Sequence, residues 1–367
     1  MRVLEIFDEI PDPRRFNAQH DLTDMLFVAF LAMLCGATNC TEFAAFCEGR
    51  LGFLRQFVAL KKGAPSHDTF SDVLRALDPH AFNLAFQRLM AGFGQQARYE
   101  AQGQLAVDGK SLRRAYEKGC AHMPPLVVTV FACATFLSLT QQVAAEGGEA
   151  EAAIRALQLL DLEDCVVSAD ALHCHRRFTQ AVVAGGGDYL VAIKANQSKL
   201  AAEAAAALDA AAGQAGPAAA NTEDQAHGRH ELRRAIVVPF QQSRGKNALE
   251  GLVAVARIQA WRTGADGKTG YEARDFGLSW LATPAEVMTY VRSHWAIENN
   301  LHWQLDVLMR EDMSRSRKQN AAANQAILGR LALNVLQADP RKIPISHKRT
   351  KARWNDQELI GLMTHMR

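Results

Sequence analysis

The chain has 367 residues, of which 49% are hydrophobic and 22% are charged, as is typical of globular proteins with two or three domains. Its seven cysteines are odd in number and form no Cys-x-x-Cys pair, which argues against a disulfide framework and against a zinc ribbon. The net charge is only +2, but between Arg292 and Arg353 there are 12 Lys and Arg against 5 Asp and Glu, which gives +7. This basic C-terminal third favours a polyanionic partner, although a solvated basic surface is the simpler alternative.

The sequence gives no sign of export or of membrane insertion. The first residues after Met1, RVLEIFDEIPDPR, are charged and contain proline, unlike a signal peptide. The longest apolar run, 126–139, is short and rich in Val, Thr and Phe, which indicates buried strands rather than a membrane span. We therefore expect a cytoplasmic protein with no membrane partner.

The first 100 residues have the apolar spacing of helices. Residues 22–37 and 80–94 repeat apolar side chains at helical intervals, and 65–79 begins with a Ser/Asp cap signal and ends at Asp-Pro. From about residue 104 the pattern changes to short β-branched runs, at 104–108, 125–139, 165–170 and 186–194. Helical segments at 151–162 and 175–187 alternate with these runs, so we expect an α/β sheet.

The segment 201–220 is low in complexity, and we expect a helix followed by a Gly/Pro-containing loop. Further strand-like runs between 228 and 281 indicate an inserted β-rich subdomain, and from about 284 the pattern is helical again.

Two acidic residues follow apolar strands. Asp108 ends QLAVD and Asp170 ends CVVSAD, so each lies at the strand end where α/β proteins build their sites. An aspartate at a strand end is also an ordinary turn residue. A third acid, Glu298, lies in the aromatic segment SHWAIENNLHWQLDV, and regular helical phase places it on one face with Trp295 and Leu301. We therefore expect Glu298 to face the interior, as a metal ligand or catalytic acid, or else as half of a buried salt bridge.

Three carboxylates that share one site require a cation, and hard oxygen ligands select Mg²⁺ or Mn²⁺. We expect two such ions, as in sites of phosphoryl transfer. The other acid of the last helix, Asp306, is eight residues from Glu298 and about 12 Å along a helix, too far to share the same ions. Zinc is a weak rival, because His173, Cys174 and His175 have no second ligand cluster to complete a site. A phosphate-binding loop ending at DGKS fails because Gln104 occupies the position of a required glycine.

Several blocks of the sequence resemble a known family. The segments AVDGKSLRRAYEKG, SADALHCHRRF, GGDYLVAIKANQ, HGRHELR and VRSHWAIENNLHWQLDVLMREDMSRSRKQNAAANQAILGRLALNVL resemble, in order, those of bacterial insertion-sequence DDE transposases of the H-repeat-associated type. The resemblance implies an RNase H-like catalytic core with an N-terminal helical domain and a β-rich insertion before the last catalytic helix. It also implies that the catalytic and metal-binding acids are Asp108, Asp170 and Glu298.

The resemblance further implies a division of the chain and a set of partners. Residues 1–100 would be a helical, DNA-binding domain, 101–340 the catalytic domain with an insertion at about 200–281, and 341–367 a basic C-terminal segment. Double-stranded DNA would be the partner, at element ends and at the target, and the chain would form a homodimer or a higher assembly in the DNA complex. The residues expected to contact DNA are Lys110, Arg113, Arg114, Lys194, Asn196, Arg229, Arg292, His294, Asn299, His302, Arg315, Arg317 and Lys318, with Lys348, Arg349 and Lys351 further along the basic tail.

The expected activity is that of a transposase, which binds terminal inverted repeats and catalyses metal-dependent DNA cleavage and strand transfer. Two alternatives stay open from the sequence: a metal-dependent endonuclease without strand transfer, and a DNA-binding derivative that has lost catalysis.

Overall fold

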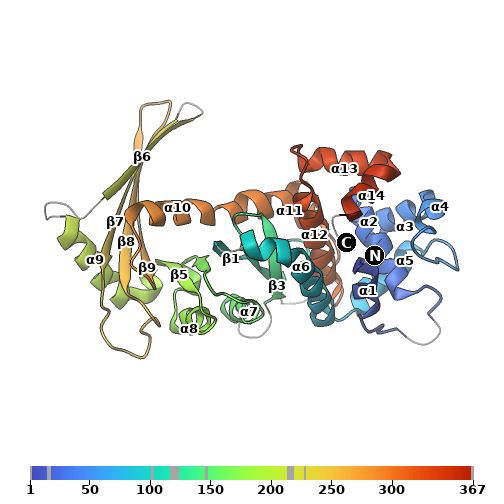
Figure 1. The fold of residues 1–367 in the computed structure, drawn as a ribbon, viewed down its shortest axis with the longest axis horizontal. Coiled ribbons are helices and arrows are strands. Elements are labelled where there is room, and N and C mark those ends of the chain that lie inside the picture. Colours follow the sequence, from blue (N-terminus) through green and yellow to red (C-terminus); the bar gives the residue numbers. More distant parts are fainter. Residues whose placement is uncertain are drawn as a thin grey trace. The chain divides into compact units, whose positions relative to one another are not determined.

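The computed structural model describes residues 2–14, 18–100, 103–115, 124–144, 148–212, 219–226 and 229–364 (Figure 1). The chain divides into two compact units. The first unit consists of Met1–Glu100, Gly109–Ala152 and Ile297–Arg367, and the second consists of Ala101–Asp108 and Ala153–Ala296. Each unit is thus assembled from segments that are far apart in the sequence.

The first unit is mainly helical. Its leading helices are α1 (Arg2–Asp8), α2 (Leu22–Leu34), α3 (Cys40–Gly49), α4 (Leu51–Leu54), α5 (His67–Ala76) and α6 (Pro79–Glu100), and its later ones are α11 (Trp303–Val307), α12 (Ala321–Ala338), α13 (Ile345–Trp354) and α14 (Asp356–Thr364). Helix α2 begins at Asp21, whose side chain accepts a hydrogen bond from the Asp24 amide. Because α2 is apolar on almost every side, it is buried along nearly its whole length.

Helix α12 forms the centre of this unit, where it is buried from Ala321 to Leu336 and packs on α2, α5, α6 and β3. Two of its buried asparagines are paired with main-chain groups. Asn324 Nδ2 donates to the carbonyls of Leu74 and Leu77, both at 2.8 Å. Asn334 accepts from the Ser138 amide at 2.9 Å and donates to the Ser138 carbonyl at 2.8 Å. These bonds fix the position of α12 against the helical leader and against β3.

The first unit contains a β-hairpin that belongs to the same sheet as β1. Strands β2 (Leu126–Ala132) and β3 (Leu137–Val143) are an antiparallel hairpin, and β2 is hydrogen-bonded to β1 (Gln104–Ser111). Strand β1 is the element that passes from the second unit into the first, between Asp108 and Gly109. Helix α7 (Gly148–Leu157) follows β3.

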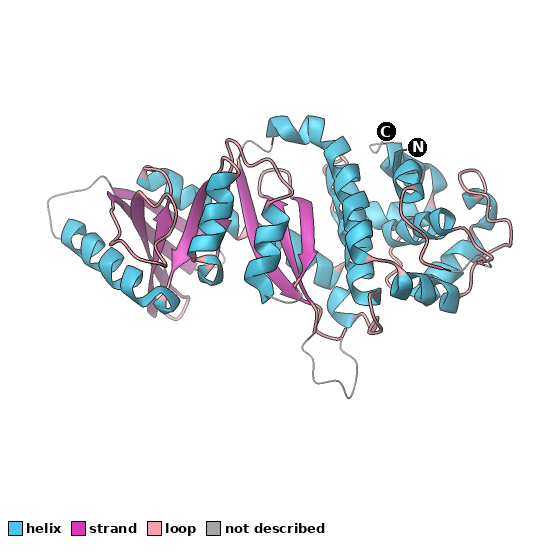
Figure 2. Cartoon of the chain, turned by 90° about the horizontal axis from the view of Figure 1, so that it is seen from below, coloured by secondary structure: helices cyan, strands magenta, loops and turns pink. Residues whose placement is uncertain are grey.

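The second unit is built on a mixed sheet whose strand order is β1-β4-β5-β9-β8-β7-β6. Strands β1, β4 (Val166–Ala169) and β5 (Asp188–Ile193) are parallel. Strands β6 (Ala219–Ala226), β7 (Arg229–Pro239), β8 (Ala254–Thr263) and β9 (Thr269–Leu278) are antiparallel, and β9 pairs directly with β5. The antiparallel strands therefore extend the sheet that begins at β1, and Figure 2 shows the strands in magenta against the cyan helices.

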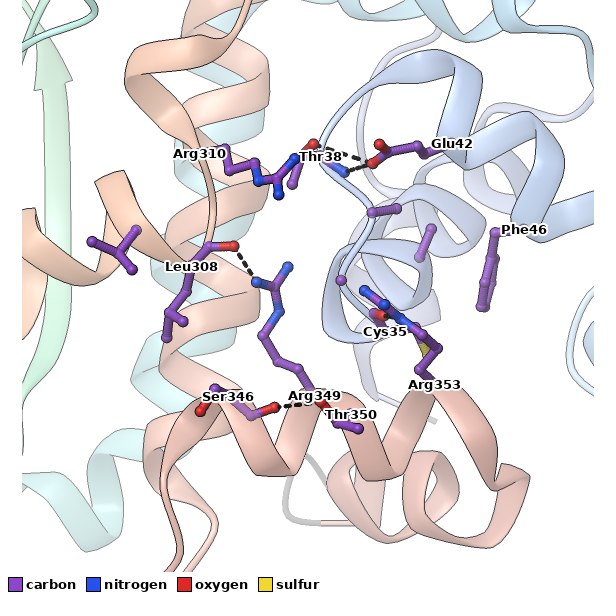
Figure 3. A pocket seen from close by; sticks show the side chains of 14 residues that line it. Cys35, Thr38, Glu42, Phe46, Leu308, Arg310, Ser346, Arg349, Thr350 and Arg353 are labelled. Atoms are coloured by element: carbon purple, nitrogen blue, oxygen red, sulfur yellow. Dashed lines mark hydrogen bonds between the residues drawn. The ribbon is translucent and has the colours of Figure 1, made fainter.

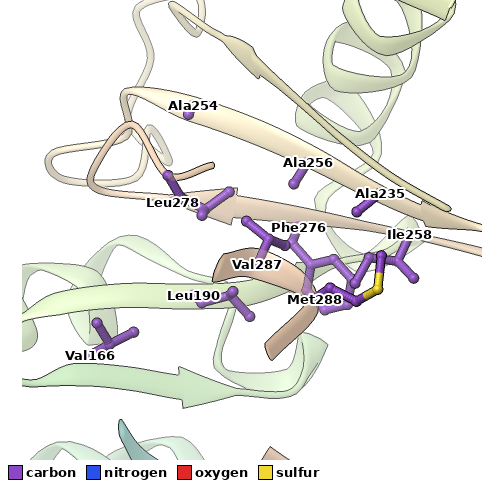
Figure 4. Packing of buried hydrophobic residues seen from close by; sticks show 11 residues of the cluster. Val166, Leu190, Ala235, Ala254, Ala256, Ile258, Phe276, Leu278, Val287 and Met288 are labelled. Carbon is purple, nitrogen blue, oxygen red and sulfur yellow. The ribbon is translucent and has the colours of Figure 1, made fainter. Parts of the chain in front are cut away.

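Two helices cover opposite faces of the antiparallel strands. Arg257 of β8 pairs with Asp209 of α9 (Ser198–Ala212) at 2.5 Å. The residues on either side of it, Ala256 and Ile258, belong instead to a buried cluster with Val287 and Met288 of α10 (Pro284–His294), shown in Figure 4. Because successive side chains of a strand point to opposite faces, α9 and α10 lie on different sides of the sheet. Helix α8 (Arg176–Ala184) connects β4 to β5.

The expected α/β class is confirmed by this mixed sheet, and the expected strands at 104–108, 165–170 and 186–194 correspond to β1, β4 and β5. One strand was not expected: β6 begins at Ala219, inside the segment assigned to a loop, and its sequence AANTEDQA is polar. Among the described residues, no helix combines the length and the apolar composition that a bilayer crossing requires.

Candidate active site

Asp108 and Asp170 lie at the ends of neighbouring parallel strands of the second unit. Val107 of β1 and Ala169 of β4 are register partners, so the two aspartates that follow them occupy adjacent positions. The strand spacing of a sheet places their main chains about 5 Å apart. Asp108 is partly buried and Asp170 is exposed. This register brings two carboxylates together at the polar end of the sheet, as the strand pattern predicts.

The turn that follows Asp170 is held by two neighbouring elements. The Asp170 side chain accepts a hydrogen bond from the Leu172 amide at 2.9 Å and so caps the short helix η1 (Ala171–His173). From the turn after β5, Asn196 Nδ2 donates to the Ala171 carbonyl at 2.6 Å and Gln197 Nε2 donates to the Cys174 carbonyl at 2.9 Å. These bonds fix the main chain on which the Asp170 carboxylate stands.

A buried hydroxyl connects α10 to the two strands. Ser168 of β4 is fully buried, and its Oγ donates to the Leu105 carbonyl at 3.2 Å and accepts from Gln104 Nε2 at 2.7 Å. The same oxygen lies 2.9 Å from His294 Nδ1, at the end of α10. Gln104 Nε2 also donates to the Tyr290 carbonyl at 2.7 Å. Ser168 and Asp170 are two residues apart, so the Asp170 carboxylate lies on the sheet face that α10 covers.

His294 is a neutral imidazole in this arrangement. Burial, more than any other cause, lowers its pKa to about 4, while the nearby Asp170 carboxylate opposes that shift and His173 adds to it. Ser168 Oγ and His294 Nδ1 form a hydrogen bond in which the tautomer of the neutral ring decides which atom donates. A neutral ring keeps one N–H and one lone pair, so His294 donates one hydrogen bond and accepts one.

The third expected acid, Glu298, lies in the first unit, in a π-helical turn at Ile297–His302. The buried positions of this segment are Ile297, Leu301 and Leu305, and Glu298 is exposed. The expectation that Glu298 faces the interior with Trp295 is therefore wrong. A π-turn adds a residue to the helix and shifts its phase, so apolar side chains occupy the buried face and the carboxylate is released to solvent. Such turns are frequent at functional sites.

The helix that follows Glu298 is held to the end of β1 by buried charges. Lys110 is 7% exposed, and its Nζ lies 2.6 Å from Asp306 Oδ1 of α11 and 3.0 Å from Asp312 Oδ1. All three residues belong to the first unit. Because Lys110 is two residues after Asp108 and Asp306 is eight residues after Glu298, this ion pair links the chain segments that carry two of the candidate acids.

A second buried ion pair continues this network. Arg330, in the apolar helix α12, is fully buried and donates to Glu311 Oε1 at 2.6 Å and to Thr129 Oγ1 at 3.2 Å. Burial, and then the charges of Arg330 and Lys110, lower the pKa of His302 to about 3, so His302 is also neutral. The Asp306 carboxylate is paired with Lys110, whereas the Glu298 carboxylate is exposed to solvent.

Close packing surrounds the residue after Asp108. A β-carbon built on Gly109 would lie 2.4 Å from Glu149 Oε1. A side chain at position 109 would therefore displace the end of the Glu149 side chain, which stands at the start of α7. The first unit thus places another carboxylate beside the chain segment that carries Asp108.

The basic residues expected to contact DNA differ in their surroundings. Lys194, Asn299, Arg113, Arg114, Arg315 and Lys318 are exposed. Arg292 is exposed and pairs with Asp224 at 3.0 Å, and Arg317 Nε donates to the Arg114 carbonyl at 2.9 Å. The side chain of Arg229 lies outside the described residues.

Some of the basic residues are structural. Besides Lys110, Lys348 is buried and donates to the carbonyls of Leu336 at 2.9 Å and Asp339 at 2.8 Å, at the end of α12. The expectation that Lys348 contacts phosphate is therefore wrong, because a cation that closes a helix end has no donor left at the surface. Arg349 is also buried.

The site offers carboxylates, which are the type of ligand that a hard divalent cation binds. Carboxylate oxygens are the ligands that Mg²⁺ and Mn²⁺ prefer, and the register of β1 and β4 places two of them side by side. In the part of the chain that the structure describes, no group of three or more His, Cys, Asp or Glu side chains is arranged to hold a metal ion. The convergence of all three acids stays a prediction.

Comparison with known proteins decides the family. The model of the Transposase DDE domain family matches residues 100–335, and a second model, described as DDE_Tnp_1-associated, matches residues 4–90. The chain belongs to the Transposase DDE domain family. The match covers β1, β4 and the π-turn, which are the elements that carry the three candidate acids of this transposase family member.

Relatives extend over the whole chain. The H repeat-associated putative transposase YhhI of Escherichia coli is 30% identical over 99% of this chain and 97% of its own. An uncharacterized protein in the dhlA 3′ region of Xanthobacter autotrophicus is 34% identical over 76% of this chain and 94% of its own. The resemblance to H-repeat-associated transposases is thus confirmed. A piggyBac transposase synaptic complex with hairpin DNA, solved by cryo-EM, matches 100% of this chain and 76% of that chain at a TM-score of 0.42 and 11% identity, which is too weak to establish a shared fold.

Proposed function

We propose that the chain is a metal-dependent transposase, which binds the terminal inverted repeats of an insertion sequence and catalyses DNA cleavage and strand transfer. One observation carries this proposal: in a member of the Transposase DDE domain family, Asp108 and Asp170 stand at adjacent positions on neighbouring parallel strands. The elements β1, β4 and β5 with their connecting helices would be the core of an RNase H-like domain.

Asp108, Asp170 and Glu298 would together hold one or two Mg²⁺ or Mn²⁺ ions. When bound, such ions supply activation of the attacking oxygen and stabilisation of the leaving oxygen in phosphoryl transfer. The chain's own contribution would be to fix the carboxylates. The cap of η1 fixes Asp170, and the Lys110–Asp306 ion pair fixes the segment after Glu298.

In the proposed reaction a water molecule attacks the phosphodiester at the element end, and the freed 3′-hydroxyl then attacks the target DNA. In the tautomer whose Nδ1 donates to Ser168, neutral His294 would offer Nε2 as an acceptor to the water or to a DNA hydroxyl. Exposed cations would bind phosphates without reading sequence, and they include Arg113, Arg114, Lys194, Arg315 and Lys318.

We further propose the division expected from the sequence: residues 1–100 as a DNA-binding domain, 101–340 as the catalytic domain with an insertion at about 200–281, and 341–367 as a basic C-terminal segment. A homodimer or a higher assembly on DNA would bring two element ends together.

The test is a strand-transfer assay with the full chain, Mg²⁺, and a duplex that carries the DNA flanking its own coding sequence. Cleavage at the element end followed by joining to a second duplex is the expected result, and chelation of the metal should abolish both. Cleavage without joining would identify an endonuclease, and binding without cleavage would identify a derivative without catalysis. Either outcome would overturn the proposal.

A further inference from the structure

A cavity of about 570 Å³ lies within the first unit, and none of the candidate acids lines it. It is lined by the end of α2 and by α3 on one side, and by residues 307–310 and α13 on the other (Figure 3). Three arginines line it, Arg310, Arg349 and Arg353, with Glu42 as the acid among the lining residues. The wall is thus positively charged, and it is built jointly by the helical leader and the C-terminal helices.

Arg349 is the most buried of the three, at 7% exposed. Its two terminal nitrogens donate to main-chain carbonyls, of Leu308 and, at 3.0 Å, of Met33. Its Nε has no hydrogen-bond partner within the described part of the chain. Burial, and then the neighbouring charge of Arg353, lower the pKa of Arg349 to about 10. A buried guanidinium whose acceptors are neutral is therefore incompletely compensated.

The other two arginines of the pocket, Arg310 and Arg353, also have no carboxylate as an ion-pair partner among the described residues. Arg353 Nε donates to the Cys35 carbonyl at 2.8 Å. The Arg310 side chain forms no hydrogen bond or ion pair among the described residues, and the Arg310 main chain is left-handed, with φ of 52°. A left-handed conformation is unfavourable in a residue other than glycine, and such residues cluster at ligand sites.

The acid in the lining does not balance these charges. One oxygen of Glu42 accepts from the Thr38 amide at 2.6 Å and from Thr38 Oγ1 at 3.1 Å, as Figure 3 shows. Capping of the α2 C-terminus accounts for the bonds of Arg349 and Arg353 to the last carbonyls of that helix. It does not account for unpaired Arg310, for the free Arg349 Nε, or for the open volume between them.

We infer that this arginine pocket binds a phosphate group of the nucleic-acid backbone, with Arg310 as the principal contact and Arg349 and Arg353 as the charged wall. The guanidinium is suited to this ligand because its planar set of donors matches phosphate oxygens. The inference rests on the proposed function for the source of the phosphate, a DNA phosphodiester. Free inorganic phosphate shares the chemistry and serves as an independent probe.

Salt dependence of DNA binding is the first test. Each phosphate contact contributes about 0.9 to the slope of log affinity against log salt concentration on double-stranded DNA. Arg310→Ala should weaken binding and reduce the slope by about one contact. The matched control is Arg244→Ala, which removes an exposed arginine from a loop of the second unit and should leave the slope unchanged. An unchanged slope in Arg310→Ala would overturn the inference.

A carboxylate placed inside the pocket gives a second test with two opposite readouts. Thr350 of α13 lines the pocket and is exposed. Thr350→Glu should imitate the bound anion, so the melting temperature should rise while DNA affinity falls. Ser71→Glu adds the same charge on the exposed side of α5 and should not stabilise the chain. A Thr350→Glu variant that melts lower than the parent and binds DNA equally well would contradict the inference.

Inorganic phosphate separates this inference from the proposed function. It should raise the melting temperature of the parent chain, and Arg310→Ala should lose most of that rise. A chain that binds no DNA but shows the phosphate effect would defeat the proposed function and leave the pocket supported. A chain that binds and joins DNA but shows no phosphate effect in either variant would defeat the pocket alone.

Discussion

The strand-end acids and the helical acid are positioned by different forces. Asp108 and Asp170 follow paired residues of a parallel ladder, so main-chain hydrogen bonds determine their spacing. Glu298 stands on a π-turn whose orientation depends on the burial of Ile297 and Leu301 and on the ion pair between Lys110 and Asp306. Ladder geometry is nearly independent of side-chain identity, whereas helix phase is set by which side chains pack. The second arrangement should therefore be the easier one to disturb.

The largest expected effect is on chemistry, and it should be the same in both regions. Asp108→Asn and Glu298→Gln each remove one proposed metal ligand, and each should lower DNA cleavage by about 10³-fold or more, because charge stabilisation of the reacting phosphate is lost. DNA affinity and melting temperature should hardly change. The measurement is cleavage of an element-end duplex in Mg²⁺, with Asp164→Asn as a control, an exposed left-handed turn residue where asparagine is well tolerated.

An active Glu298→Gln variant would show that Glu298 is not the third ligand. The third ligand would then be another acid. Glu149, beside Gly109, would be the next residue to substitute.

The next effect is on stability, and it should be confined to the helical region. Lys110→Met leaves the carboxylates of Asp306 and Asp312 without their buried cation, which should cost about 3–5 kcal/mol of unfolding free energy. Asp306→Asn keeps the shape of the side chain and should cost less. Denaturant unfolding of the two single variants and of the double variant gives the coupling energy, which should be at least about 1 kcal/mol. Additive losses would show that the pair does not hold the helix.

The sequence predicts the strand-end region, which carries Asp108 and Asp170, better than the helical region around Glu298, and the reason is physical. An apolar β-branched run that ends in Asp marks a strand and its polar tip locally, so Asp108 and Asp170 could be placed without knowing what packs against them. The phase at Glu298 required knowing that Ile297 is buried, which depends on tertiary contacts. The polar strand β6 was missed because its residues lack the apolar alternation on which strand prediction relies.

One residue of the buried ion network could have been recognised from the sequence, although strand and helix periodicity does not reveal it. Arg330 stands alone in the apolar helix AAANQAILGRLALNVLQA, and a lone arginine in such a helix requires a partner. Its partner Glu311 and the neighbouring Lys110 lie in ordinary polar segments, so only the fold reveals the pairing. For the same reason, a lysine after Asp108 is easily assigned to DNA when it belongs to the interior.

A smaller effect tests the hydroxyl that holds the strand-end region together. Ser168→Ala removes the hydrogen-bond partner of Gln104 and His294 and should cost about 1–3 kcal/mol of unfolding free energy. Ser138 is a matched control, because it is equally buried in a strand of the other unit while its hydroxyl has no partner among the described residues. Ser138→Ala should be close to neutral. Equal losses in the two variants, measured by chemical denaturation, would mean that the Ser168 network adds nothing beyond packing.

The most gradual expected effect is a pH dependence to which both regions contribute. Burial holds the pKa of His294 at about 4 and that of His302 at about 3, against an ordinary value of 6.5. Between pH 6.5 and 4 the unfolded chain binds protons that the folded chain does not, so stability is complete above pH 6.5 and falls as the pH is lowered toward the folded pKa values. Each pKa unit corresponds to at most about 1.4 kcal/mol, and partial exposure reduces it. His294→Gln and His302→Gln should each flatten the fall in unfolding free energy from pH 6.5 to 4, whereas His347→Gln, at an exposed position of α13, should not. If only His302→Gln flattened it, the acid sensitivity would belong to the helical region alone, and the strand-end region would be the one that tolerates a charged histidine beside its carboxylates.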